Sequence, residues 1–208
     1  MSHDKSWSRL AGLLAGCTVA LIVPGLARAD CVHPNNATCE FSSPTTLYEF
    51  YNGYSAPAVV PITSGVTLQA GWYYYVNGYY APGTTYINAG GSISNSISFY
   101  NGAFAEGILA INSGGIFSNF GIFYNGYQAN GTLIVDGGTF TNSGTFYNGA
   151  YYYYGGIGTV TVSDGGTFTN SGTFRNGASD YSYYYGSTGT VTVGDGGTFT
   201  NSGTFHNG

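Results

Sequence analysis

The stretch GTVTVSDGGTFTNSGTFRNG spans Gly158–Gly177 and is the most informative segment of this chain. It returns almost unchanged as GTVTVGDGGTFTNSGTFHNG at Gly189–Gly208, and in a shorter form, GTLIVDGGTFTNSGTFYNG, at Gly131–Gly149. Self-similarity at a period of about 20–50 residues is the mark of solenoids, propellers and arrays of stacked units. The repeat therefore predicts an architecture of stacked units, and it does not by itself indicate an activity.

Side chains alternate in character along this stretch. The even positions from Val160 to Asn176 are apolar, Asn or Gly apart from Asp164, whereas the odd positions are almost all Thr or Ser. An alternation of period two indicates β-structure, but it persists here for far longer than one ordinary strand of about 5–6 residues. We therefore predict several short strands that turn corners at Asp-Gly-Gly and Asn-Ser-Gly while every even position, Asp164 included, points inward.

An aromatic-x-Asn-Gly signature marks the end of each repeat. Its asparagines are separated by 25, 24, 24, 23, 28 and 31 residues, and they are Asn52, Asn77, Asn101, Asn125, Asn148, Asn176 and Asn207. Where the spacing grows, the additional residues follow the Asn-Gly directly, as one variable loop per repeat. This pattern predicts an all-β fold, a parallel β-solenoid of about seven coils with about 23–24 core residues per coil, at residues 47–208.

Stacked repeats would place like residues above like. Two aromatic ladders are expected, one through Phe50, Tyr75, Phe99, Phe123, Phe146, Phe174 and Phe205 and one through Ile93, Phe117, Phe140, Phe168 and Phe199. The signature asparagines form one polar ladder, and Asn95, Asn119, Asn142, Asn170 and Asn201 form a second. The rival fold is an antiparallel meander, because Asn-Gly between alternating hydrophobics is also a strong hairpin signal.

The motif Gly-Thr-Phe-Thr-Asn-Ser-Gly-Thr-Phe-x-Asn-Gly resembles the repeats of bacterial autotransporter passengers and filamentous-haemagglutinin-like adhesins. The resemblance covers residues 83–208, and 47–82 more loosely. It implies a right-handed parallel β-helix at the cell surface, with an outer-membrane translocator if the chain continues. Phe stands where that family more often has Leu or Ile, and no translocator barrel follows Gly208 in this sequence.

Residues 1–29 have the pattern of an export signal. Lys5 and Arg9 precede an apolar segment, and a small-x-small site predicts cleavage between Ala29 and Asp30. The alternative is lipid attachment at Cys17, within Leu-Ala-Gly-Cys. Cleavage would leave Cys31 and Cys39 as an even pair, for which an oxidising compartment predicts a disulfide in a lead-in segment at residues 30–46.

The charge pattern narrows the function classes. Only 6% of residues are charged, and Arg175 is the one basic side chain after residue 29. Phosphate contacts depend on Lys and Arg, so nucleic acid is not an expected partner. We expect no enzyme, cofactor or metal ligand set. His33 and His206 are the histidines beyond the signal, and His206 is expected to point outward like Tyr147 and Arg175.

Three acidic residues precede glycines at the same corner, namely Asp136, Asp164 and Asp195. Carboxylates one coil apart suit calcium, although Asp before Gly-Gly is also ordinary turn chemistry. The sequence leaves both interpretations open.

The variable loops after Asn-Gly are rich in tyrosine. Candidate ligand-contact residues are Tyr79, Tyr80, Tyr127, Tyr151, Tyr152, Tyr153, Tyr154, Tyr181, Tyr183, Tyr184 and Tyr185. Tyrosine on loops offers a large contact area at low entropic cost, as in antibody paratopes. The alternative is that these rings merely pack on the outside of the coils.

Two functional hypotheses follow. The first is a secreted or surface-displayed adhesin that binds host or matrix glycans or proteins through the tyrosine-rich loops. The second is a structural subunit that self-associates by stacking its coil ends into a fibre or matrix, since an open solenoid end is an unpaired sheet edge.

Overall fold

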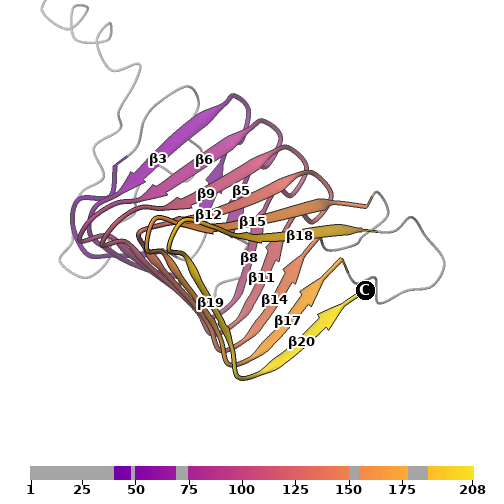
Figure 1. Cartoon of the computed structure of the whole chain (residues 1–208). Coiled ribbons are helices and arrows are strands. Elements are labelled where there is room, and N and C mark those ends of the chain that lie inside the picture. The colour runs from indigo at the N-terminus through magenta and orange to yellow at the C-terminus, as the bar shows by residue number, and fades with distance from the viewer. Residues whose placement is uncertain (1–39, 48–49, 69–74, 150–154, 178–186) are drawn as a thin grey trace, which may run out of the picture.

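The chain folds as a parallel β-solenoid. A computed structural model describes residues 40–47, 50–68, 75–149, 155–177 and 187–208, and all of its regular elements are strands. Successive coils stack along one axis and enclose a single core (Figure 1). Each of six coils contributes one strand to each of three parallel sheets, and a seventh contributes two strands. The predicted fold class is confirmed, and the antiparallel alternative is wrong because all strand pairs within the three sheets are parallel.

The first sheet has seven strands. They are β1 (Thr45–Leu47), β4 (Gly65–Leu68), β7 (Ser92–Asn95), β10 (Ile116–Asn119), β13 (Thr139–Asn142), β16 (Thr167–Asn170) and β19 (Thr198–Asn201). Their register places Phe117 between Ile93 and Phe140, so that the second predicted aromatic ladder forms as expected.

The second sheet also has seven strands. They are β2 (Phe50–Asn52), β5 (Tyr75–Asn77), β8 (Ser98–Asn101), β11 (Ile122–Asn125), β14 (Thr145–Asn148), β17 (Thr173–Asn176) and β20 (Thr204–Asn207). The first aromatic ladder runs through this sheet in register from Phe50 to Phe205.

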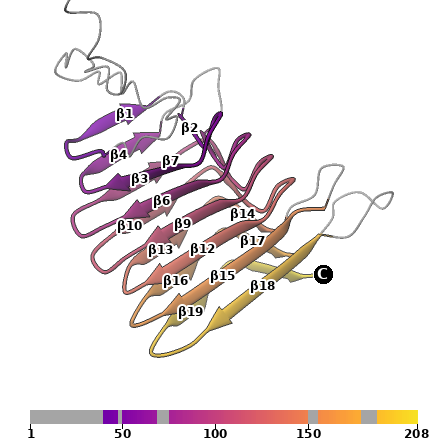
Figure 2. The same cartoon turned by 90° about the horizontal axis from the view of Figure 1, so that it is seen from above.

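The third sheet has six strands. They are β3 (Ala58–Ile62), β6 (Gly83–Ile87), β9 (Gly107–Ile111), β12 (Gly131–Asp136), β15 (Ile157–Ser163) and β18 (Thr188–Val193). Figure 2 shows these strands side by side, each displaced by one coil. Beyond β3, Phe41 forms a parallel bridge with Ile62 and packs its ring edge-on against Phe50.

The two aromatic ladders meet inside the solenoid. Within a ladder the rings stack in parallel, as Phe123 and Phe146 do at a centroid distance of 4.9 Å. Between ladders they meet edge to face, as Phe123 and Phe140 do at 5.4 Å and 89°. Offset-stacked and edge-to-face pairs are the favoured geometries of aromatic rings. From Phe99 onward, phenylalanine therefore fills the interior with the same two contacts repeated from coil to coil.

Two asparagine ladders complete the interior. Each Nδ2 donates to the Oδ1 of the asparagine in the next coil, at 2.7–2.8 Å from Asn52 to Asn207. The ladder from Asn95 to Asn201 repeats this at 2.6–2.7 Å. Every bond runs in the same direction, so each ladder carries an acceptor at its first coil and a donor at its last.

The glycine of the Asn-Gly corner is required by backbone conformation. Gly126 has φ +82°, a left-handed conformation that residues with a Cβ rarely adopt, and a Cβ there would collide with the carbonyl oxygen of Ile157. This corner therefore turns the chain tightly and brings adjacent coils into close backbone contact.

The predicted parity is wrong at one corner. Asp164 was expected to point inward with its even neighbours, but its side chain is exposed. Both Asp164 and Gly165 have positive φ, at 51° and 80°. These two left-handed residues reverse the alternation locally and turn the aspartate towards solvent, while Val162 before the corner and Phe168 after it remain buried.

Candidate binding surface: the tyrosine stripe

The outer face of the second sheet carries an aromatic column. At the position between the ladder aromatic and the ladder asparagine, successive strands present Tyr51, Val76, Tyr100, Tyr124 and Tyr147 in register. Arg175 and His206 continue the column on the last two strands. The prediction that His206 points outward like Tyr147 and Arg175 is confirmed, because the three residues are aligned in register and His206 is exposed.

The column tyrosines stack on one another. The rings of Tyr100 and Tyr124 lie 4.8 Å apart with 12° between their planes, and those of Tyr124 and Tyr147 lie 5.1 Å apart with 10°. The guanidinium carbon of Arg175 lies 5.7 Å from the Tyr147 ring centroid, within the range of a cation–π contact. The sheet spacing thus imposes an ordered row of rings on the molecular surface.

Aromatic residues of the Asn-Gly loops fold back onto this column. Tyr127 packs edge-on against Tyr100 at 4.9 Å and against Tyr124 at 5.1 Å. Two loops earlier, Tyr79 packs edge-on against Tyr51 at 5.0 Å. We call the column tyrosines together with Tyr54, Tyr79, Tyr80, Phe104 and Tyr127 the tyrosine stripe.

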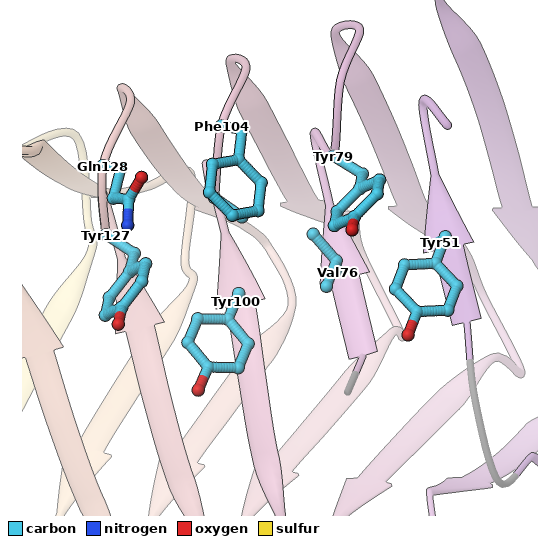
Figure 3. Close-up of a pocket in the computed structure, with 8 residues that line it drawn as sticks. Tyr51, Val76, Tyr79, Tyr100, Phe104, Tyr127 and Gln128 are labelled. Atoms are coloured by element: carbon cyan, nitrogen blue, oxygen red, sulfur yellow. The ribbon is translucent and has the colours of Figure 1, made fainter. Parts of the chain in front are cut away.

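The column is interrupted at Val76, and the interruption leaves a hollow. The hollow has a volume of about 310 Å³ and is lined by Tyr51, Val76, Tyr79, Tyr100, Ala103, Phe104, Tyr127 and Gln128. Figure 3 shows Val76 between the rings of Tyr51 and Tyr100, with Tyr79, Phe104 and Tyr127 on the loop side. A short side chain in a row of tyrosines therefore opens a gap flanked by aromatic rings.

The phenol of Tyr79 stays protonated to a higher pH than an ordinary tyrosine. The Tyr79 hydroxyl donates a hydrogen bond to the Tyr80 oxygen at 3.4 Å. This bond, followed by burial of the ring, raises the pKa of Tyr79 to about 12. None of the residues that line the hollow carries a charge, so its surface consists of aromatic, aliphatic and amide groups.

The predicted loop tyrosines fall into two groups. Among the described ones, Tyr79 and Tyr127 are half-buried on the sheet, whereas Tyr80 is 64% exposed. The other eight candidates, Tyr151, Tyr152, Tyr153, Tyr154, Tyr181, Tyr183, Tyr184 and Tyr185, lie outside the described residues. Cys17, Ala29, Asp30, Cys31, His33 and Cys39 lie outside them as well, so the predicted cleavage, lipidation and disulfide stay predictions.

Sequence reasoning did not select the strand residues of the stripe. Tyr51, Tyr100 and Tyr124 occupy the x position of aromatic-x-Asn-Gly, next to a buried aromatic, and the repeat pattern predicts for this position only an outward direction. The available signal was the recurrence of tyrosine at x in four of the first five coils, broken once by Val76.

The acidic corner does not form a three-carboxylate ladder. The corner after β12 is one residue shorter than the one after β15, so that Asp136 pairs in register with Ser163 and not with Asp164. A hydrogen bond between the carboxyl groups of Asp136 and Asp164, followed by their charge repulsion, raises the pKa of Asp164. Across the part of the chain that the structure describes, no three His, Cys, Asp or Glu side chains are grouped as a metal site.

Comparisons of the chain with protein-family models, with curated proteins and with solved structures gave no match. The resemblance to adhesin repeats therefore extends only as far as the β-solenoid fold. The described residues also contain no helix long and apolar enough to cross a membrane.

Proposed function

We propose that this chain is an adhesive, non-catalytic β-solenoid that is exported and displayed at the cell surface, where it binds host or matrix glycans or proteins through the tyrosine stripe. One observation carries the proposal, the row of partly exposed aromatic rings on the second sheet. The export-signal pattern of residues 1–29 supports the location. We propose that the signal is cleaved after Ala29, and the alternative is a lipid anchor at Cys17. If the chain continues, an outer-membrane translocator is the proposed export partner.

The stripe is suited to adhesion because it is preorganised. Its strand tyrosines stand on a hydrogen-bonded sheet, and ring contacts hold the loop aromatics against them. Binding surfaces lose affinity when side chains must be ordered, at a cost of about 0.5–1.5 kcal/mol for each rotamer-rich side chain. Tyrosine has few rotatable bonds, so a stacked row retains most of its contact energy.

The expected ligand is uncharged. The cation beside the stripe is Arg175, which lies over Tyr147, and a surface next to one basic group lacks the electrostatic basis for nucleic-acid binding. Neutral glycans and the polar, aromatic faces of matrix proteins are the proposed partners. The tyrosines at 151–154 and at 181 and 183–185 are proposed as further ligand-contact residues, because tyrosine recurs in the sequence after most of the Asn-Gly pairs.

Replacing Tyr100, Tyr124 and Tyr147 together by serine is expected to weaken surface binding at least tenfold. Each substitution removes one partly exposed ring, and the stacking of a nucleic-acid base on an aromatic side chain, which is an analogous contact, is worth about 1–3 kcal/mol. The measurement is the half-saturating concentration of labelled full chain on beads coated with neutral glycans or with matrix proteins.

The matched control is the triple variant Tyr86→Ser, Ile116→Ser and Phe120→Ser. These are exposed large side chains on the third sheet, on the first sheet and at the corner between the first and second sheets, and none of them belongs to the stripe. Equal binding by the two triple variants would contradict the proposal. A further variant with serine at the tyrosines of 151–154, 181 and 183–185 separates the loop contribution from that of the strands.

The one-way asparagine ladders favour a second candidate function, end-to-end assembly. At the first coil the Oδ1 of Asn52 is buried and has no hydrogen-bond partner among the described residues. At the last described coil, Asn207 accepts from Asn176 and is exposed, and Phe205 is 40% exposed. The first coil of a second copy, stacked on this end, would place Phe50 and Asn52 beside Phe205 and Asn207, continue these two ladders and pair the strand edges.

Full chain at high concentration is expected, on this second candidate, to sediment as oligomers whose size rises with concentration. Phe205→Asp places a charge in the contact between stacked coils and should return the sedimentation coefficient to that of a monomer. Phe104→Asp is the control, since Phe104 is exposed on the loop side and not at a coil end. Monomeric sedimentation of the unmodified chain, without thioflavin-positive fibres, would refute the candidate.

A further inference from the structure

The hollow over Val76 lies where the tyrosine column lacks one ring. Adjacent strands in a sheet lie about 4.8 Å apart, so Tyr51 and Tyr100, which are two strands apart, are separated by about twice that distance. In the later coils this interval is filled by a tyrosine ring, with centroids 4.8 and 5.1 Å from its neighbours. At Val76 the row offers the same interval without the ring.

The hollow is preformed. Its floor is made of Val76 and Ala103, which are each 3% exposed and are held by the backbone of the second sheet and its corner. The backbone amides of Ala103 and Tyr127 donate to the carbonyls of Gly78 and Gly102 in the preceding coils, at 3.2 and 2.9 Å. A site with fixed walls pays little ordering entropy when a ligand enters.

The walls combine apolar ring surface with hydroxyl groups. Tyr51 and Tyr79 lie on one side, Tyr100 and Tyr127 on the other, and Figure 3 shows their phenol oxygens directed towards the same side of the hollow. The amide of Gln128 adds a side chain that both donates and accepts hydrogen bonds. A ligand that fits needs an apolar face against the rings and a polar edge beside the hydroxyls.

A pyranose ring has this distribution of groups. Its axial C–H bonds form an apolar face that meets the negative face of an aromatic ring, and its hydroxyls project from the rim. No carboxylate, guanidinium or ammonium group lines the hollow, so an acidic or basic sugar would be desolvated without a partner charge. At about 310 Å³ the hollow stands at the lower end of the range of small-molecule sites, roughly 300–1,000 Å³, which suits one sugar unit.

We infer that the hollow over Val76 is a sugar subsite that binds one uncharged pyranose unit of a neutral glycan between Tyr51 and Tyr100. The inference rests on the proposed adhesive function and names the chemistry of one point on the stripe. The occupant takes the place of the missing tyrosine ring, with Tyr79 and Tyr127 closing the loop side and Ala103 beneath it.

The test uses full chain and three neutral hexasaccharides, cellohexaose, maltohexaose and N-acetylchitohexaose, with hexagalacturonate as the anionic comparison. Saturation-transfer NMR detects ring contacts, and titration calorimetry measures affinity. Val76→Tyr completes the column and fills the hollow with a residue that the same position carries in neighbouring coils. Val76→Ala keeps the hollow open and is the matched control, and thermal unfolding verifies that both variants are folded.

At least one neutral hexasaccharide is expected to bind, and Val76→Tyr to weaken that binding tenfold or more. Val76→Ala should stay within about threefold of the unmodified chain, and hexagalacturonate should bind more weakly than the neutral probes. Absence of binding by all three neutral probes, equal binding by the Val76→Tyr variant, or preference for hexagalacturonate would each overturn the inference.

The same variants separate this inference from the proposed function. If Val76→Tyr binds the neutral hexasaccharides as well as the unmodified chain does, while the triple serine variant of the stripe fails to bind coated beads, the sugar subsite is refuted and adhesion through the stripe stands. If the triple serine variant binds beads normally, while Val76→Tyr abolishes hexasaccharide binding, the stripe proposal fails and the subsite stands.

Discussion

Phe146→Ala is expected to lower the free energy of unfolding by about 3–5 kcal/mol, the usual cost of removing a buried phenylalanine ring. The ring is fully buried at the middle of the first aromatic ladder. It stacks on Phe123 at 4.9 Å and on Phe174 at 4.8 Å. Edge-to-face contacts at 5.4 Å join it to Phe140 and Phe168 of the second ladder.

The measurement is chemical denaturation followed by far-UV circular dichroism. A lost ring in the centre of the stack cannot be compensated easily, because the sheet spacing prevents the coils above and below from closing the cavity. The cost should therefore lie well above that of deleting a surface ring.

Phe205→Ala is the control for this prediction. Phe205 belongs to the same ladder, stacks only on Phe174 within it, and is 40% exposed at the last described coil. Its removal is expected to cost about 1 kcal/mol or less, since less apolar area returns to water. Similar losses at the two positions would mean that the stacked core is not the main source of stability.

Asn125→Leu is expected to lower the free energy of unfolding by about 2–5 kcal/mol, although leucine has nearly the same size. Asn125 accepts from Asn101 Nδ2 and donates to Asn148 Oδ1, both at 2.8 Å, and it also donates to the Thr159 carbonyl at 2.8 Å. Leucine leaves the Asn148 oxygen without its donor and the Asn101 amide without one acceptor. Each buried unsatisfied group costs about 1–3 kcal/mol.

Asn207→Leu separates this effect from a general preference for asparagine at the corner. Asn207 is exposed and accepts one ladder bond, from Asn176, so that water replaces what is lost. Denaturation midpoints of the two variants are to be compared at equal protein concentration. If the Asn125→Leu variant is as stable to denaturant as the Asn207→Leu variant, the ladder hydrogen bonds make no net contribution to the free energy of unfolding.

Most of the scaffold could be predicted because the same residue pattern recurs in successive coils. The period-two pattern of Val160, Val162 and Phe168 assigned the inward face, and all three are fully buried. The recurrence of aromatic-x-Asn-Gly assigned the register, because only in-register parallel stacking brings each asparagine opposite its equivalent. The loop insertions did not disturb this register, since they occur at one corner of the coil.

The predicted side-chain directions were wrong at the Asp-Gly-Gly corner. Asp164 follows the even positions in the sequence, but left-handed φ values at Asp164 and Gly165 move its carboxyl group to the surface. A one-residue difference between the corners after β12 and β15 likewise displaces Asp136 from the register of Asp164. Periodicity describes side-chain direction within strands, whereas turns with positive φ reset it.

A parallel β-solenoid, its coil boundaries, its aromatic and asparagine ladders, its scarcity of charge and the place of Val76 between Tyr51 and Tyr100 all follow from the repeat. That Tyr79 and Tyr127 fold back onto the strands and enclose a hollow could be seen only in the folded chain. A ladder follows from local repetition, because every coil has the same pattern. The hollow depends instead on contacts between side chains of different coils. It also depends on a ring that is missing from the tyrosine column, and the column exists only across several repeats.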